Sequence, residues 1–254
     1  MKPGRVVRAG EFLLHLIPAT REPDVNAKIK LIYEDDALIA IDKPAPLPMH
    51  PCGRFNRNSL TSILNTVYEP LRPKPAHRLD AETSGVVLFS KTKQIARLIQ
   101  PQFDRGAVRK RYFARVVGTP SEDQFECQLA IGTSPGPGGA RVPDEAGAAA
   151  HTRFSVNEKF ADGTTLLEVE PVTGRTNQIR VHLWSLGLPI VGDPIYLPGE
   201  KLCDAKTRNV GDSALCLHAA SIEFIHPTTN ERMQVESPLP AWGNPLFSSE
   251  SDRY

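Results

Sequence analysis

The segment "HRLDAETSGVVLFS", residues 77–90, joins a polar turn to a short apolar run. Its apolar end, Val86 to Phe89, is continuous and predicts a buried strand. Asp80 lies just before this strand, where the scaffold is rigid enough to hold a reacting group. An aspartate in a turn with threonine and serine more often caps backbone N–H groups. Spacing alone therefore favours a capping role for Asp80 and leaves catalysis as the minority interpretation.

The segments around this one carry both strand and helix patterns. Apolar residues three and four apart predict helices, and alternating residues predict strands that pair as hairpins. Strands outnumber helices, so the expected fold class is α+β with a largely antiparallel sheet. In chain order we expect a hairpin over 30–43, a helix from Ser59 to Pro70, a strand over 85–92, a helix over 92–106, a strand over 110–118, a hairpin over 151–174, a helix over 176–187 and a hairpin over 215–240.

Two segments rich in proline and glycine are predicted to be loops. Residues 43–53 contain too many prolines for a helix or a central strand. Residues 131–150, "IGTSPGPGGARVPDEAGAAA", predict a long surface loop or flap. We expect an N-terminal extension over residues 1–26, one domain over 27–242 and a polar tail over 243–254.

Composition places the chain among ordinary globular proteins. Of 254 residues, 40% are hydrophobic and 23% charged, which is unlike a disordered chain. The net charge of +1 gives no global attraction to nucleic acid or membrane, so any contact with a polyanion must come from local clusters. The four cysteines form no CxxC pair, which argues against a zinc site and a disulfide framework and fits a reducing cytoplasm. No apolar run reaches the roughly 20 residues that a membrane helix needs.

Basic residues gather between residues 105 and 115. No acid interrupts them after Asp104, and Tyr112 and Phe113 lie among them. Cations follow phosphates and aromatic rings stack on bases, so this pattern suits contact with a polynucleotide. The alternative is a solvated edge strand guarded by charge. The basic residues are Arg105, Arg109, Lys110, Arg111 and Arg115.

Residues 171–193 contain a second pair of candidate arginines. Arg175 and Arg180 are five residues apart, so on one helix they would point in different directions. We expect Arg175 at the turn and Arg180 on the helix. The planar guanidinium suits buried carboxylates and phosphates, but a helix start with structurally paired arginines is an equally good interpretation.

Taken together, these segments resemble the RluA-type pseudouridine synthases. The signature lies in "HRLDAETSG", and the resemblance covers residues 31–240. It implies a mixed, largely antiparallel sheet in two abutting subdomains with a central catalytic cleft. The supporting segments, in the order that the family shows, are "IYEDDALIAIDKPAPLPMHP", "KRYFARVVG", "GRTNQIRVHLWSLGLPIVGDPIY" and "LCLHAASIEF".

The resemblance implies an isomerase that converts a uridine in structured RNA, ribosomal or transfer, to pseudouridine. The bond from C1′ to N1 is cut, the uracil turns while it is held, and C5 is joined to C1′. The resemblance implies no metal and no organic cofactor, and RNA as the partner. We expect a cytoplasmic monomer without membrane association.

The resemblance also assigns roles to individual residues. Asp80 matches the catalytic aspartate, which either attacks the sugar or removes a sugar proton. Tyr112 matches the tyrosine that packs on the target base, and Arg180 the arginine that pairs with the catalytic carboxylate. Arg78 matches the arginine that helps to occupy the space left by the flipped nucleotide. The remaining expected RNA contacts are Arg175, Arg109, Lys110 and Arg111.

Two residue positions depart from the family pattern, and two rival functions remain. Pro44-Ala45-Pro46 replaces the more usual Pro-Ala-Gly type of turn. Asn177 stands where the family usually has histidine, and it can form hydrogen bonds but cannot titrate. Only the last strand of a small N-terminal RNA-binding module is expected, over residues 5–18. One rival is a catalytically silent RNA-binding relative of the same fold. The other is a carboxylate-dependent glycoside hydrolase, which needs a second carboxylate across the bond.

Overall fold

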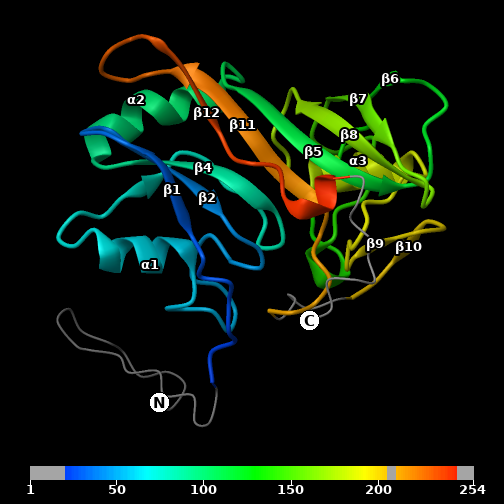
Figure 1. Ribbon diagram of the computed structural model, residues 1–254, viewed down its shortest axis with the longest axis horizontal. Coiled ribbons are helices and arrows are strands. Elements are labelled where there is room, and N and C mark those ends of the chain that lie inside the picture. Colours follow the sequence, from blue (N-terminus) through cyan, green and yellow to red (C-terminus); the bar gives the residue numbers. More distant parts are fainter. Residues whose placement is uncertain (1–20, 205–209, 245–254) are drawn as a thin grey trace.

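The structure, a computed structural model, describes residues 21–204 and 210–244 and is built on one large mixed sheet (Figure 1). The strands run in the order β1-β2-β4-β11-β5-β8-β7-β6, while β12 pairs with β11 and β3 with β4. The expected α+β class is confirmed, since every pairing but one in this sheet is antiparallel within the described residues. The strands are β1 (Lys30–Glu34), β2 (Leu38–Lys43), β3 (Lys74–Pro75), β4 (Ser84–Ser90), β5 (Arg109–Val117), β6 (Gln124–Cys127), β7 (Thr152–Lys159), β8 (Thr164–Pro171), β11 (Leu217–Ile225) and β12 (Arg232–Glu236).

Three α-helices and a small ribbon complete the described chain. The helices lie where the apolar spacing predicted them: α1 (Leu60–Val67), α2 (Lys93–Asp104) and α3 (Gln178–Ser185). The ribbon pairs β9 (Tyr196–Leu197) with β10 (Lys201–Leu202), and two short 3₁₀ helices are η1 (Pro137–Gly139) and η2 (Ala241–Gly243). The strand expected over residues 5–18 and most of the expected tail lie outside the described residues.

A side-chain cap explains where α2 begins, whereas the expected cap of α1 does not form. The Thr92 hydroxyl accepts a hydrogen bond from the Ile95 backbone N–H at 3.2 Å, which caps α2. Ser59 occupies the expected cap position of α1, but its side chain makes no capping bond. Its hydroxyl instead bonds the Ser62 hydroxyl at 2.9 Å and the Asn56 carbonyl at 3.3 Å.

The strand predicted from "GVVLFS" is buried on both faces. Val86 and Leu88 face a core that contains Ile99 of α2. Val87 and Phe89 face a core that contains residues of α1. Figure 1 shows α1 and α2 on opposite sides of this half of the sheet. A strand covered on both faces reads as a continuous apolar run because neither set of alternating side chains meets water.

The one parallel pairing joins the two halves of the sheet. Strands β4 and β11 share only the pairs Ser84–His218 and Gly85–Ala219. Gly85 has φ +112°, and a Cβ there would lie 2.2 Å from the Ala219 carbonyl oxygen, so the backbones meet in a way that only glycine allows. This seam puts the turn that contains Asp80 beside the other half of the sheet.

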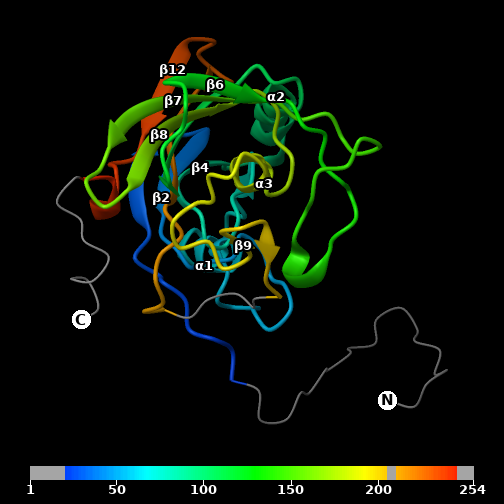
Figure 2. The ribbon, with the colours of Figure 1, turned by 90° about the vertical axis from the view of Figure 1, so that its right-hand side faces the viewer.

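The second half carries its own core beneath β5, β7, β8 and α3. Ala114, Leu167 and Leu183 belong to this core, and Tyr112 packs against it as well as against the core under α1. Figure 2 looks onto this half, with α3 and the β9–β10 ribbon below the strands β6, β7 and β8. A single tyrosine therefore lies where the two halves meet.

Candidate active site

A cleft of about 590 Å³ opens between the two halves of the sheet. One wall consists of residues 76–80 and the C-terminal end of α2. The other consists of residues 171–177 and the first turn of α3, and Lys110 and Tyr112 of β5 line the cleft between the walls. The volume falls within the range of about 300–1,000 Å³ that is usual for ligand sites.

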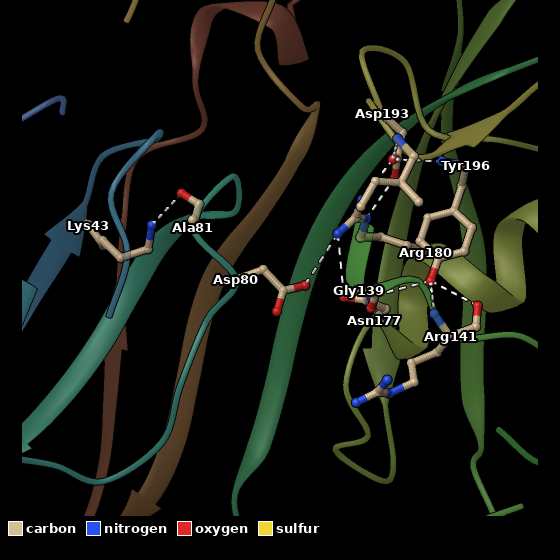
Figure 3. Close-up of polar contacts among 10 residues, drawn as sticks. Lys43, Asp80, Ala81, Gly139, Arg141, Asn177, Arg180, Asp193 and Tyr196 are labelled. Carbon is tan, nitrogen blue, oxygen red and sulfur yellow. Dashed lines mark hydrogen bonds and ion pairs between the residues drawn. The ribbon is translucent and has the colours of Figure 1, made fainter. Parts of the chain in front are cut away.

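Asp80 lies in this cleft, in the turn just before β4. Its side chain is 25% exposed, and its Oδ2 lies 3.6 Å from Nη1 of Arg180. The Asp80 carbonyl accepts a hydrogen bond from the Thr83 N–H at 3.1 Å, which closes the turn. Figure 3 shows the Asp80 carboxylate directed across the cleft to Arg180. The turn therefore holds the carboxylate while leaving it open to a ligand.

A buried lysine supports the other side of this turn. Lys43 is fully buried, and its Nζ donates to the carbonyls of Ala81 at 3.1 Å, Leu47 at 3.0 Å and Pro44 at 3.1 Å. Burial lowers the pKa of Lys43 to about 7, although nearby carboxylates, first among them Glu82, act in the opposite direction. Lys43 thus anchors the residue that follows Asp80 to the proline-rich loop.

Arg180 is held by a second, fully buried aspartate. Its Nε and Nη2 donate to Oδ2 and Oδ1 of Asp193 at 2.7 and 2.8 Å. Its guanidinium also lies over the Tyr196 ring, 5.0 Å from the centroid. Burial opposes the charge, but the Asp193 carboxylate outweighs it and raises the pKa of Arg180, with a smaller contribution from Asp80. Only Nη1 is left to face the cleft.

Asp193 is itself fixed by the backbone. Its Oδ1 accepts hydrogen bonds from the N–H groups of Ile195 at 2.8 Å and Tyr196 at 3.0 Å. A carboxylate with this many donors is held in one orientation. Arg180 is therefore fixed through Asp193 and not through Asp80.

Tyr112 lies on the floor of the cleft. Burial, and to a lesser degree the Asp80 carboxylate, raises the pKa of its phenol well above the usual value. The phenol therefore keeps its proton at neutral pH. Its ring offers a packing surface beside the Asp80 carboxylate.

The expected RNA contacts fall into two groups. Arg78, Arg175 and Lys110 line the cleft together with Asp80, Tyr112 and Arg180. Arg109 and Arg111 lie on the opposite face of β5, because alternate strand residues point to opposite faces. There they pair with the carboxylates of Glu170 at 3.7 Å and Glu236 at 3.1 Å.

The prediction that the whole basic run from Arg105 to Arg115 suits contact with RNA is wrong for Arg115, which is buried. Its residue is 2% exposed, and its guanidinium bonds the Thr164 hydroxyl, the Trp242 carbonyl and the Asp162 carboxylate. Arg105, by contrast, is exposed and lines the cleft.

Three residues of the site were not predicted from the sequence. Asp193 and Tyr196 lie inside the segment that carried the resemblance, and nothing in their spacing from Arg180 revealed the contact. Lys43 stood at the start of the proline-rich loop, where a lysine is normally exposed. Among the described residues, no cluster of three His, Cys, Asp or Glu side chains is placed to hold a metal ion. Within the same ranges, no helix is long and apolar enough to cross a membrane.

Known proteins resemble this chain over most of its length. The family model "RNA pseudouridylate synthase" matches residues 37–185. A protein of Vibrio cholerae named ribosomal large subunit pseudouridine synthase C is 34% identical over 216 residues, which are 83% of this chain and 66% of that protein. An uncharacterised RNA pseudouridine synthase of Synechocystis is 32% identical over 240 residues, 94% of this chain and 82% of that protein.

The fold is shared with a solved human structure. Human RNA pseudouridylate synthase domain containing 4 superposes with a TM-score of 0.67 and 26% identity, covering 84% of this chain and 90% of that one. The expected resemblance to RluA-type enzymes is confirmed by these relatives. The chain belongs to the RNA pseudouridylate synthase family, whose members are isomerases.

Proposed function

We propose that the cleft converts a uridine of structured RNA to pseudouridine, with Asp80 as the reacting carboxylate. The observation that supports this most is the pairing of Asp80 with Arg180 through a single guanidinium nitrogen at 3.6 Å. The guanidinium orients one carboxylate oxygen, and the rest of the carboxylate surface stays accessible to a ligand. Both chemical roles considered for Asp80, attack on C1′ and removal of a sugar proton, require the ionised form.

The reaction breaks the bond from C1′ to N1 and makes one from C1′ to C5, with loss of the C5 proton. The uracil must remain in the cleft while it turns. Tyr112 would pack against it as a neutral phenol, since its raised pKa disfavours the phenolate. A direct role of Tyr112 as a base is correspondingly disfavoured.

The charges around the cleft support RNA as the substrate. Extrusion of a uridine from a folded RNA costs a few kcal/mol, which contacts to the backbone must offset. The lining has more cations than carboxylates: Arg78, Arg105, Lys110, Arg175 and Arg180 against Asp80 and Asp104. We infer that Arg78, Lys110 and Arg175 contact the RNA, whereas Arg109 and Arg111 lie too far round the sheet to do so with a nucleotide in the cleft.

Ribosomal RNA is the first substrate to test, because the Vibrio cholerae relative is named for the large ribosomal subunit. Transfer RNA is the alternative. Comparing pseudouridine maps of total RNA from cells with and without the gene identifies the modified site. The expected monomeric state and cytoplasmic location remain predictions.

A glycoside hydrolase is the weaker interpretation. Asp193 is the second carboxylate near Arg180, but its side chain is 1% exposed and both of its oxygens accept hydrogen bonds. It cannot reach a glycosidic bond in the cleft. Asp104, which also lines the cleft, lies on α2, and no contact links it to Arg180.

The decisive experiment replaces Asp80 by asparagine, which keeps the shape and removes the charge. We expect pseudouridine formation to fall at least about 1,000-fold, as when a reacting group is lost, and RNA affinity to stay within about twofold. Asp104→Asn is the matched control and should remain active. Full activity of Asp80→Asn would refute the mechanism, and a wild-type protein that binds RNA without modifying it would support the silent relative.

A further inference from the structure

The loop between β6 and β7, residues 128–151, is fixed against α3 at its base. Ile131, Ala140 and Ala150 of the loop share a buried cluster with Val181 of α3 and Tyr196. The Arg175 Nε donates to the Ala149 carbonyl at 3.0 Å. Figure 2 shows the loop running beside α3. A long glycine-rich segment is thereby held next to one wall of the cleft.

The hydroxyl of Tyr196 fastens the middle of this loop. It accepts a hydrogen bond from the Arg141 N–H at 2.7 Å and donates to the Arg141 carbonyl at 2.9 Å. It also accepts from Nδ2 of Asn177 at 3.1 Å, and that nitrogen lies 3.3 Å from the Gly139 carbonyl. Asn177 lines the cleft. The backbone of Arg141 is thus fixed through two side chains at the α3 edge of the cleft.

The side chain of Arg141, in contrast, has no partner among the described residues. Its Nη1 is buried and forms no hydrogen bond. The nearby acids do not neutralise it: Asp144 and Glu145 are exposed, and Asp144 accepts from the Ala146 N–H at 3.0 Å. A buried donor left unpaired costs about 1–3 kcal/mol, so such a group points to a ligand. In Figure 3 the guanidinium extends back beneath Asn177, toward the side on which Asp80 lies.

We propose that Arg141 binds a backbone phosphate of the RNA at the α3 edge of the cleft, near Asn177. The proposal rests on the proposed function and adds a contact outside the reacting centre. A guanidinium matches the oxygens of a phosphate with two parallel N–H bonds. The backbone of Arg141 is already held by the Tyr196 hydroxyl, so little conformational freedom is lost when the RNA binds. The loop then acts as a clamp on the strand that carries the target uridine.

Arg141→Gln tests the contact directly. With an unmodified transcript of large-subunit rRNA as the probe, we expect affinity to fall about five- to tenfold. The slope of log affinity against log salt should fall by about 1, as for one lost phosphate contact. The turnover number at saturating RNA should be unchanged. Arg141→Lys, which keeps the charge, should restore most of the salt slope.

Arg153→Gln is the matched control, since Arg153 is an exposed arginine on β7 that lines a groove with Glu168 and Glu170, away from the cleft. Its affinity and salt slope should be those of the wild type. Tyr196→Phe keeps the ring over Arg180 and removes only the hydroxyl, so it should weaken RNA binding in the same direction by a smaller factor. Thermal unfolding of each variant shows whether the fold is intact.

Unchanged affinity and salt slope in Arg141→Gln would overturn the proposal, as would an equal loss in Arg153→Gln. These outcomes are separate from the test of the catalytic residue. If Asp80→Asn is inactive while Arg141→Gln binds normally, only the phosphate contact fails. If Asp80→Asn is fully active while Arg141→Gln binds weakly, the catalytic assignment fails and the contact stands.

Discussion

Two buried arginines, Arg115 and Arg180, have similar surroundings and different consequences. Each is at most 4% exposed, each pairs with an aspartate and each lies over an aromatic ring. Arg115 directs Nε to the Thr164 hydroxyl, Nη1 to the Trp242 carbonyl and Nη2 to Asp162. Arg180 directs two nitrogens to Asp193 and turns Nη1 to Asp80 and to Oδ1 of Asn177 at the cleft.

The two arginines differ in how many of their guanidinium nitrogens are engaged by structural partners. All three guanidinium nitrogens of Arg115 are engaged by the protein, so its charge ties the β7–β8 turn to η2. Arg180 uses two nitrogens for its contact with Asp193. Its third nitrogen, Nη1, faces the cleft, where it donates to Oδ1 of Asn177 at 3.4 Å and lies 3.6 Å from the Asp80 carboxylate. A buried arginine is thus a functional candidate when its structural partner leaves a nitrogen directed at a cavity.

The largest expected effect concerns stability and follows from the two aspartates. Asp193→Ala leaves the Arg180 charge buried without its main partner, so the free energy of unfolding should fall by about 3–5 kcal/mol. Asp162→Ala should cost about 1 kcal/mol, because Asp162 is 47% exposed and Arg115 keeps two other acceptors. Urea denaturation of both variants measures the contrast. Equal losses would show that the two pairs play the same role.

The next effect concerns activity and uses the arginines themselves. Arg180→Lys loses the two-pronged contact with Asp193, so the remaining charge is no longer aimed at Asp80. We expect the turnover number to fall about 100-fold, of the size seen when one oriented donor is removed. RNA affinity should change less than threefold. Arg115→Lys should lower the free energy of unfolding and leave the turnover number unchanged. A loss of turnover as large as that of Arg180→Lys would contradict the purely structural role assigned to Arg115.

The smallest effect is a pH dependence at Asp162. Burial opposes its ionisation, but the hydrogen bonds from Thr164 and the Arg115 charge lower the pKa of Asp162 below its ordinary value of 3.8. The folded state therefore holds fewer protons than the unfolded state near that pH, and this stabilisation is lost as the pH falls below about 3.8. The stability difference between wild type and Asp162→Asn should be constant above pH 5 and shrink below about pH 4. A difference that grows on acidification would contradict the assigned sign.

Local patterns predicted the elements well. The hairpin of β1 and β2, the helix α1 and the buried strand β4 lie where the apolar periods placed them. Each depends on contacts between near neighbours in the chain or on a repeat that burial imposes. The alternation of side chains along a strand also separates Lys110 and Tyr112 from Arg109 and Arg111. The run of charges by itself does not show this separation.

The support of the site could not be predicted in the same way. Asp193 approaches Arg180 only because the chain after α3 turns back, and Lys43 reaches Ala81 across 38 residues. Arg115 has the same parity on β5 as the solvent-facing Arg109 and Arg111, yet η2 and Phe160 cover it. Such long-range contacts have no local period. The resemblance named residues that line the cleft but not the residues that hold them in place.

The position of β11 between β4 and β5 also sets an order of events during synthesis on the ribosome. Asp80 lies just before β4 and Tyr112 lies on β5. Among the described residues, these two strands do not pair with each other, and both pair with β11, residues 217–225. A nascent chain that has emerged only as far as β8 holds most of the residues of the cleft but no seam to bring the two halves together. We therefore expect the enzyme to become competent only when nearly the whole chain has left the exit tunnel. An emerging fragment is then kept from acting on the RNA that surrounds it.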